Sequence, residues 1–229
     1  MSKPLYAVSM RVQQAVGYRE PRDALAHDWW GQIDAWGGLP LPAPNLGKGI
    51  GDWLDVLAPA VVILTGGNDV IPRDGTDDDR SPERDTTEHA MITWAGERGV
   101  PVFATCRGLQ VVNLHFGGAV HEIADKGSHV GCDHAVTLSS PLSDLAGSDT
   151  ATVNSFHNLG VAPDAVGDCL DICAVSTDDG LVEALVHRDA PIVALHWHPE
   201  RRAPGTRGFE DILFQRLLAE GAFWKEMNV

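Results

Sequence analysis

"PVFATCRGLQVVNLHFGG", residues 101–118, joins a short apolar strand to an apolar helix through a single cysteine. The pattern predicts a strand over Val102–Thr105 and a helix over Arg107–Phe116, with Gly108 leaving room for the tight turn between them. One interpretation of Cys106 is a buried thiol, because a free cysteine packs as a small hydrophobe. The other is a nucleophile, since the amino end of a helix stabilises a thiolate. The corner alone leaves both interpretations open.

Apolar runs and amphipathic stretches alternate along most of the chain, and this alternation predicts the architecture around the corner. The run Ala60–Thr65 is short and apolar, as in strands that are buried on both faces. We expect an α/β fold with a doubly wound, mostly parallel central sheet flanked by helices, in a single domain over residues 1–229. The other expected strands are Leu5–Met10, His134–Leu138, Leu170–Ser176, Val182–His187 and Ile192–Trp197, and the other expected helices are Pro21–Trp36, Ser81–Arg98 and Phe209–Glu220.

Composition argues against several classes of partner. The chain of 229 residues carries a formal net charge of −15, so its surface repels phosphate backbones and anionic lipids. We therefore expect no nucleic-acid partner and no membrane partner. The first ten residues, MSKPLYAVSM, lack the apolar core of a signal peptide, and the four cysteines lack the spacing of a disulfide framework. These features predict a reduced, cytoplasmic protein.

Two further segments supply groups that a cysteine nucleophile needs. In ALHWHPE, residues 194–200, His198 and Glu200 follow a strand, and an imidazole with a carboxylate beside it can take a thiol proton. In LTGGNDV, residues 64–70, two glycines end a buried strand and let a backbone N–H approach a substrate oxygen. Taken singly, the first segment is also compatible with an exposed turn, and the second with an ordinary strand-to-helix turn.

Together, and in this order, the three segments resemble the class I glutamine amidotransferases. A strand with Gly-Gly-x-Asp is followed by Cys-Arg-Gly-x-Gln at a strand-to-helix corner and by Trp-His-Pro-Glu near the C-terminus, over roughly Leu5 to Leu218. The resemblance implies the flavodoxin-like fold of that family. It also implies that a cysteine attacks the γ-amide carbon of a glutamine-like group to give a γ-glutamyl thioester, which water hydrolyses. Neither a cofactor nor a metal is implied.

The resemblance assigns roles to particular residues. It implies Cys106 as the nucleophile, His198 as the general base and acid, and Glu200 as the group that orients His198. The same resemblance implies an oxyanion hole from the backbone N–H groups of Gly67 and Arg107, and a place near the glutamyl end of the substrate for Gln110.

Two features depart from the family's usual pattern. Ala104-Thr105 stands before the cysteine, where Gly-Ile or a similar pair is usual, so we expect a slightly reshaped corner. A second histidine, His196, lies two residues before His198 on the same strand. We expect His198 to be the base, because it alone is followed by Pro-Glu.

Within the family, several segments resemble the free-standing γ-glutamyl hydrolases, such as the γ-glutamyl-γ-aminobutyrate hydrolases. They include GGNDV, RDTTEHAMITWA, CRGLQVVNLHFGGAVHEI and VNSFHN, and the last implies that Ser155, Phe156 and His157 line the glutamyl pocket. A buried structural histidine is the alternative for His157. The N-terminal part resembles the γ-glutamyl-CDP-amidate hydrolases. There, Arg11, Arg19 and Arg22 would suit a diphosphate or carboxylate, with surface charge as the alternative.

We therefore expect a hydrolase that cleaves a small γ-glutamyl conjugate, such as a nucleotide-linked one, and releases glutamate without a cofactor. Two alternatives stay open. One is a glutaminase subunit that delivers ammonia to a separate synthetase, and the other is an inactive binding module on the same fold. A homodimer is also left open.

Two segments carry metal-ligand residue types without a recognised spacing. HVGCDH, which contains His129, Cys132 and His134, matches no zinc pattern, and the acidic stretch Arg73–Asp85 is typical of a solvated loop. We expect no metal at either segment, with a cation site as the alternative. Cys169 and Cys173 are expected to be packing residues.

Overall fold

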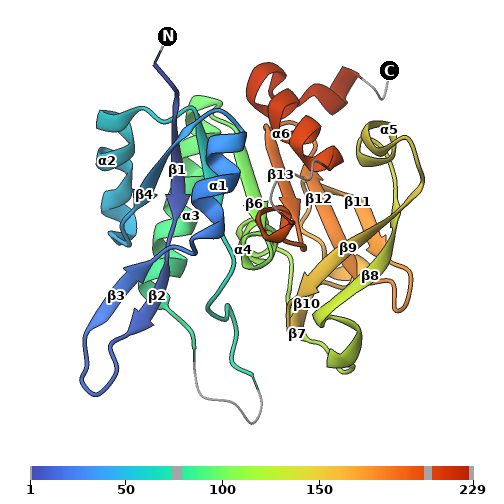
Figure 1. The fold of residues 1–229 in the computed structure, drawn as a ribbon, viewed down its shortest axis with the longest axis horizontal. Coiled ribbons are helices and arrows are strands. Elements are labelled where there is room, and N and C mark those ends of the chain that lie inside the picture. Colours follow the sequence, from blue (N-terminus) through green and yellow to red (C-terminus); the bar gives the residue numbers. More distant parts are fainter. Residues whose placement is uncertain (1, 74–78, 204–207, 227–229) are drawn as a thin grey trace.

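A nine-stranded mixed sheet runs through the centre of the molecule (Figure 1). The computed structural model describes residues 2–73, 79–203 and 208–226. Two small sheets lie outside the large one, formed by β2 (Arg11–Gln14) with β3 (Pro21–Ala24) and by β7 (His121–Glu122) with β10 (Leu159–Gly160). The strand order in the large sheet is β4 (Leu39–Ala43), β1 (Leu5–Ser9), β5 (Val61–Leu64), β6 (Val102–Thr105), β13 (Ile192–Leu195), β12 (Val182–His187), β11 (Leu170–Ser176), β8 (Val130–Leu138) and β9 (Thr150–Phe156).

One half of this sheet is parallel and the other half is antiparallel. The strands from β4 to β13 pair parallel with their neighbours, and those from β13 to β9 pair antiparallel. Every residue of β5, β6 and β13 is buried, as parallel strands with cover on both faces require. The α/β prediction is thus confirmed. Every strand of the antiparallel half lies after Gly118, where short strands were expected in place of strand–helix alternation.

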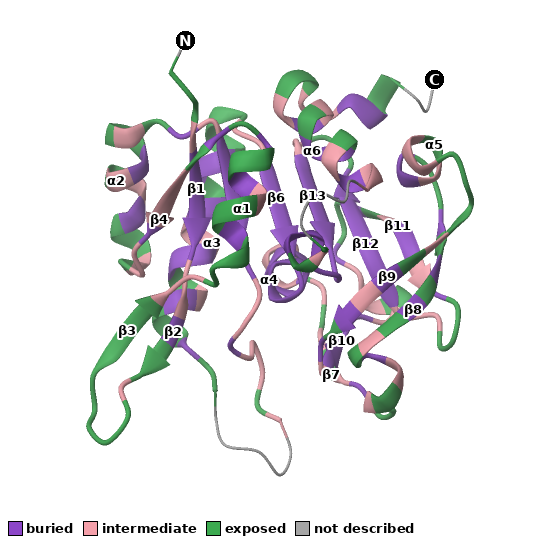
Figure 2. Ribbon diagram, in the orientation of Figure 1, coloured by how far each residue is buried: buried purple, intermediate pink, exposed green. Residues whose placement is uncertain are grey.

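Helices cover the sheet on both faces, and alternate residues of each strand face two separate cores. Helices α2 (Ile50–Leu57), α3 (Pro82–Arg98) and α4 (Arg107–His115) pack on one core with Ala7 and Val62. Helices α1 (Asp28–Ala35) and α6 (Phe209–Glu220) pack on the other core with Val8 and Ile63. The short helix α5 (Leu142–Ala146) lies beside α6. Figure 2 shows the buried residues concentrated in the central strands and the helix sides that face them.

The termini of α3 follow the capping signals in the sequence. Ser81 is extended and its hydroxyl accepts a hydrogen bond from the backbone N–H of Arg84, while Pro82 takes the first helical position. Gly99 ends the helix with a φ of +66°, a left-handed conformation that costs glycine little. The expected helix Ser81–Arg98 is confirmed.

The predicted helix Pro21–Trp36 is wrong in its first part. Pro21–Ala24 is strand β3, which pairs antiparallel with β2 in an exposed hairpin (Figure 2). The helix begins at Asp28 and buries Trp29 and Ile33. Cross-strand pairing satisfies the backbone of residues 21–24, and proline is tolerated as the first residue of a strand. The sequence analysis also did not identify β4, α2 or β9.

Among the helices in the described part of the chain, none combines the length and the apolar character that a bilayer crossing requires.

The aromatic cluster around Phe214 offers a test of the packing. Its ring stacks on Trp36 at 3.9 Å and meets the edges of Tyr6 and Phe103 at 5.4 Å each. Phe214→Ala should lower the free energy of unfolding by about 3–5 kcal/mol, because a large buried ring leaves a cavity. Ile212→Ala, on the exposed side of the same helix, is the control and should stay within about 0.5 kcal/mol. Urea denaturation measures both, and equal effects would contradict the assignment of this core.

Candidate active site

The candidate catalytic residues follow three neighbouring strands of the parallel half. Gly66 and Gly67 follow β5, Cys106 follows β6 and His198 follows β13, and these three strands are adjacent in the sheet. The carboxyl ends of parallel strands meet at one edge of the sheet, which is where α/β proteins place their ligands. A Cβ added to Gly66 would lie 2.8 Å from His198 Cε1 and 3.6 Å from Cys106 Sγ. The structure therefore brings these segments together.

Cys106 has a strained backbone conformation at the corner between β6 and α4. Its φ of +52° and ψ of −109° lie outside the regions that residues with a side chain favour. Its backbone N–H donates to the carbonyl oxygen of Leu195 at 2.8 Å, which ties the corner to β13. A side chain at Gly108 would lie 2.7 Å from the carbonyl oxygen of Leu64. The corner thus requires glycine at position 108, and Ala104 is accommodated in full burial.

His198 is held by a side-chain partner and by a backbone partner. Its Nδ1 lies 2.6 Å from Glu200 Oε1, and both side chains are almost fully buried. Asn154 on β9 accepts a hydrogen bond from the backbone N–H of His198 at 2.8 Å and donates one to its carbonyl oxygen at 2.9 Å. Since Glu200 fixes the ring through Nδ1, Nε2 is the atom left to exchange a proton with a neighbour.

The electrostatics of Cys106 and His198 favour a thiolate beside an imidazolium. Burial by itself raises the pKa of the Cys106 thiol, but the positive charge of the nearby His198 ring outweighs burial and lowers that pKa. Burial lowers the pKa of His198, but Cys106 and Glu200 raise it to about 9. Each group thus stabilises the charged form of the other at neutral pH.

His196 belongs to a different environment. Its Nδ1 lies 3.1 Å from the carbonyl oxygen of Val182 and its Nε2 lies 3.2 Å from the side-chain amide of Gln110. Its ring stacks on His157 with centroids 3.6 Å apart. Burial holds the pKa of His196 well below its usual range, so the ring is neutral. The arrangement favours His198 over His196 as the proton acceptor.

A fully buried ionic network supports the loops on either side of Cys106. Arg84 donates to the carbonyl oxygens of Thr65, at 2.8 Å, and of Gly66, at 3.2 Å, and its Nε donates to Glu88 at 2.8 Å. Arg107, which follows the cysteine, donates to the other oxygen of Glu88. Burial lowers the pKa of Arg84 to about 10, so the group is still charged at neutral pH. The network therefore links the Gly66–Gly67 loop to the start of α4.

The positions expected to form an oxyanion hole adjoin this network. Gly67 has a φ of +84°, and its carbonyl oxygen accepts a hydrogen bond from Arg84. Arg107 is the first residue of α4, so its backbone N–H is one of those that lack a partner within the helix. The side chain of Arg107 is occupied by Glu88 and Asp85. The guanidinium is thus held away by these carboxylates, and the backbone N–H is the group of Arg107 that could face a substrate oxygen.

A cavity of about 60 Å³ lies beside His198. Arg11 lines this cavity, and Arg22 does not. Arg11 Nε is buried without a hydrogen-bond partner, and its guanidinium lies 3.6 Å from Asp79. Arg22 lies on the exposed hairpin, where it pairs with Glu20 and with the hydroxyl of Tyr18 at 2.7 Å each. The structure therefore does not bring Arg22 to the site. The full lining is Arg11, Ala24, Leu25, Ala26, Trp29, Thr65, Gly66, Gly67, His198, Glu200 and Arg201.

Of the three residues expected to line a glutamyl pocket, the structure places Phe156 beside His198. The two rings meet edge to face at 5.6 Å, and the Arg201 guanidinium lies over Phe156 at 4.5 Å. Alternation along β9 directs the neighbours elsewhere. Ser155 donates to the carbonyl oxygen of His129 at 2.7 Å, and His157 Nδ1 lies 3.1 Å from the carbonyl oxygen of Leu159. Ser155 and His157 thus have partners inside the protein.

Gln110 also has internal partners. Besides its contact with His196, its amide nitrogen donates to the carbonyl oxygen of Leu159 at 3.3 Å, and the side chain is buried. Gln110 lies one turn after Cys106 on α4, so it packs behind the corner. These contacts link the helix that follows Cys106 to strands β9 and β10.

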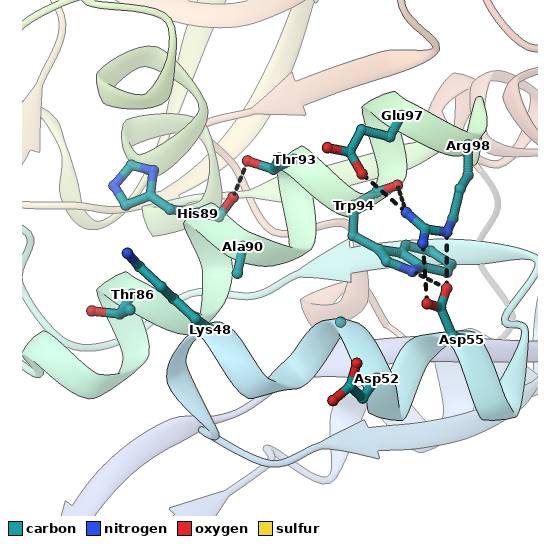
Figure 3. Close-up of a pocket in the computed structure, with 11 residues that line it drawn as sticks. Lys48, Asp52, Asp55, Thr86, His89, Ala90, Thr93, Trp94, Glu97 and Arg98 are labelled. Carbon is teal, nitrogen blue, oxygen red and sulfur yellow. Dashed lines mark hydrogen bonds and ion pairs between the residues drawn. The ribbon is translucent and has the colours of Figure 1, made fainter.

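A larger cavity, of about 610 Å³, lies between α2 and α3 (Figure 3). Its lining includes Asp55, which accepts hydrogen bonds from Trp94 at 2.7 Å and from Arg98 at 3.1 Å. None of Cys106, His198 and Glu200 lines it. The larger cavity therefore does not mark the candidate active site.

The remaining sequence expectations have mixed outcomes. Cys173 is buried, and burial raises the pKa of its thiol to about 12, so it is a packing residue. Cys169 is exposed, so that prediction is wrong. Residues 74–78 of the acidic stretch lie outside the described residues, and Asp85 in the described part pairs with Arg107.

Sequence reasoning did not identify Asn154, Arg84 or Arg201 as site residues. Asn154 stands in VNSFHN, two residues before Phe156, so alternation could have placed both on one face. Arg84 and Glu88 are four residues apart on a helix that carries a Trp and a Met toward the core. That spacing indicated a helix, but not that its charges are buried.

Alkylation by iodoacetamide tests the charge state of Cys106. Because its pKa is lowered, the alkylation rate of Cys106 should rise at a lower pH than that of an ordinary thiol. His198→Ala removes the stabilising charge, so the rate at pH 7 should fall about tenfold or more and its midpoint should move to higher pH. Mass spectrometry of the modified peptides follows each cysteine separately. Exposed Cys169 is the internal control, and an unchanged Cys106 profile in the variant would contradict the pairing.

Comparisons with known proteins agree with this arrangement. The sequence pattern of the Peptidase C26 family matches residues 4–200. A Mycobacterium tuberculosis protein provisionally named a glutamine amidotransferase is 31% identical over 214 residues, which is 84% of this chain and 68% of that protein. A Schizosaccharomyces pombe protein with the same provisional name is 33% identical over 157 residues. That match spans 61% of this chain and 61% of the yeast protein.

Two further similarities are to a chain of a synthase and to a solved structure. The carbamoyl phosphate synthase small chain of Akkermansia muciniphila is 32% identical over 124 residues, 52% of this chain and 30% of that one. A crystal structure from Thermoplasma acidophilum, described as one component of a GMP synthase, has a TM-score of 0.66 over 100% of this chain and 99% of that chain. At 20% identity this likeness concerns the fold alone. The match over residues 4–200 shows that the chain belongs to the Peptidase C26 family of class I glutamine amidotransferase-like proteins.

Proposed function

We propose that this chain is a cysteine hydrolase that cleaves the γ-glutamyl amide bond of a small γ-glutamyl conjugate and releases glutamate. The observation that carries the proposal is the grouping of Cys106, His198 and Glu200 at the carboxyl ends of β6 and β13. Membership of the Peptidase C26 family supports the reaction class, which is hydrolysis of a carbon–nitrogen bond.

The first half of the reaction would form a thioester. The Cys106 thiolate attacks the γ-carbonyl carbon, and the electron pair of the C=O bond moves to the oxygen. The backbone N–H groups of Gly67 and Arg107 would stabilise that oxyanion. When the tetrahedral intermediate collapses, the C–N bond breaks and His198 Nε2 gives its proton to the leaving amine.

The second half would return the enzyme to its starting state. A water molecule gives a proton to the now neutral His198 and attacks the thioester carbon, and the C–S bond breaks. Glutamate leaves, and the proton on His198 again faces the Cys106 thiolate. Glu200 holds Nδ1 throughout, so the proton moves only at Nε2.

The charges around the small cavity support an anionic substrate. Arg11 and Arg201 line the cavity together with His198, and each guanidinium can pair with a carboxylate or a phosphate. A volume of about 60 Å³ is small and Cys106 does not line it, so most of the substrate would lie outside this cavity. These features favour a conjugate that carries negative charge, such as a nucleotide-linked γ-glutamyl amide.

The alternative function is a glutaminase that passes ammonia to a separate synthetase. The similarity to carbamoyl phosphate synthase small chains supports it over about half of this chain. The two functions share the thioester chemistry and differ in the leaving group, so a comparison of substrates separates them.

Substitution of the two histidines tests which one is the base. His198→Ala should lower kcat/KM for a γ-glutamyl amide by about 10²–10⁴-fold, because no group then takes and returns the proton. His196→Asn should have a smaller effect, since His196 contacts Gln110 and Val182 rather than Glu200. Steady-state release of glutamate gives both values. A larger loss in His196→Asn, with the fold intact by circular dichroism, would contradict the assignment.

The substrate preference of an Arg11 variant tests whether the cavity binds an anionic substrate. Arg11→Gln should raise KM for an anionic γ-glutamyl conjugate by roughly 10–100-fold, the effect of losing one charged hydrogen bond, and should change KM for glutamine less. Arg22→Gln removes an arginine of the neighbouring strand outside the cavity and is the matched control. If the wild-type chain prefers glutamine to every larger conjugate, the glutaminase alternative replaces the hydrolase.

A further inference from the structure

Three histidines and one glutamate meet in the antiparallel half of the sheet, where nothing in the proposed reaction uses them. Glu183 stands on β12, His134 on β8, His129 directly before β8 and His157 directly after β9. All four side chains are at least nine-tenths buried. Four ionisable groups in one buried cluster require a reason, because unpaired charge and unpaired polar atoms are costly in the interior.

The outer contacts of two histidines fix the tautomer that each presents to Glu183. His129 Nε2 lies 2.9 Å from Asp179 Oδ2, a carboxylate oxygen that can only accept, so Nε2 carries the hydrogen. His157 Nδ1 lies 3.1 Å from the carbonyl oxygen of Leu159, so Nδ1 carries the hydrogen. In the neutral rings, His129 Nδ1 and His157 Nε2 are then lone pairs.

Both lone pairs face the same carboxylate oxygen. Glu183 Oε1 lies 3.6 Å from His129 Nδ1 and 3.4 Å from His157 Nε2. All three atoms are buried without a hydrogen-bond partner. Three acceptors that face one another repel unless a cation lies between them.

The spacing indicates which kind of cation fits. Charge-assisted hydrogen bonds between nitrogen and oxygen are about 2.7–2.9 Å long, so a shared proton would draw the atoms closer. A tetrahedral Zn²⁺ with bonds of about 2.0–2.2 Å holds its ligand atoms about 3.3–3.6 Å apart, which matches both distances to Glu183. The three ligand atoms lie within 4.8 Å of one another.

We propose that His129 Nδ1, His157 Nε2 and Glu183 Oε1 bind a divalent transition-metal ion of the Zn²⁺ type. Imidazole nitrogen favours such ions over Mg²⁺ or Ca²⁺, which prefer oxygen ligands. His134 Nε2 lies 3.6 Å from the second oxygen of Glu183 and completes the polar surroundings. Asp179 supplies the outer carboxylate that commonly orients a metal-bound histidine.

This proposal takes up the cation site that the sequence analysis left open as the alternative at HVGCDH. The expectation of no metal rested on spacing along the chain, whereas His157 and Glu183 come from other strands. The site does not depend on the proposed reaction. It lies behind the candidate active site, because His157 stacks on His196 and His196 contacts Gln110. The ion would stabilise the packing of strands β8, β9 and β12 against one another.

The test uses the full chain without an affinity tag. After dialysis against EDTA, Zn²⁺ is titrated while the metal content and the melting temperature are followed. We expect about one equivalent of tightly held Zn²⁺ and a melting temperature that rises with Zn²⁺ concentration, because a ligand of the native state stabilises it. Mg²⁺ and Ca²⁺ should produce neither effect. Co²⁺ should give the visible absorption of a four-coordinate nitrogen–oxygen site.

Variants locate the site. Glu183→Gln, which keeps the size of the side chain, and His157→Ala should each abolish the Zn²⁺-dependent shift and the Co²⁺ absorption. Asp179→Asn keeps the ligands and should weaken binding by about 10–100-fold. His115→Gln removes one histidine of the separate His89–His115 pair and should bind metal as the wild type does.

Two outcomes would overturn the proposal. One is a wild-type chain that binds no Zn²⁺ and shows no shift in melting temperature, a result that does not depend on whether the variants fold. The other is a Co²⁺ spectrum that persists in Glu183→Gln and His157→Ala but disappears in His115→Gln, which would place the metal at the other pair.

Discussion

The buried pairing of Glu88 with Arg84 and Arg107 is the interaction on which the candidate site depends. It joins three segments that are far apart in the sequence: the Gly66–Gly67 loop, helix α3 and Arg107, which follows Cys106. Removing one partner from a buried ion pair leaves an uncompensated charge, which typically costs about 3–5 kcal/mol. The network therefore stabilises the geometry of the loops beside Cys106 rather than adding only to the overall stability.

This support explains how the chain maintains a strained residue at the corner. Cys106 adopts a positive φ while its backbone N–H is held by Leu195 and the next residue is held by Glu88. Strained backbone conformations persist where the surroundings over-determine them, and such sites are commonly functional. Cys106 Sγ and the His198 ring both lie beside Gly66, and the backbone of His198 is held by Asn154.

The sequence patterns predicted the strands and helix ends whose formation depends on a few neighbouring residues. The apolar runs of β5, β6 and β13 and the caps of α3 were identified because burial and capping act over a few residues. The hairpin over Arg11–Ala24 was not identified, since its pairing competes with a plausible helical start. Within the site, order and spacing placed Cys106, His198 and Glu200, but contacts between strands decide which of Ser155, Phe156 and His157 reach it.

The central claim is that Cys106 carries the glutamyl group during turnover. The most direct test is mass spectrometry of the enzyme after acid quench during turnover of a chromogenic γ-glutamyl anilide. We predict a mass increase of one γ-glutamyl group on the peptide that contains Cys106, removed by hydroxylamine as a thioester would be. Continued release of the amine with no adduct at Cys106, or with the adduct on Cys132 or Cys169, would contradict the account.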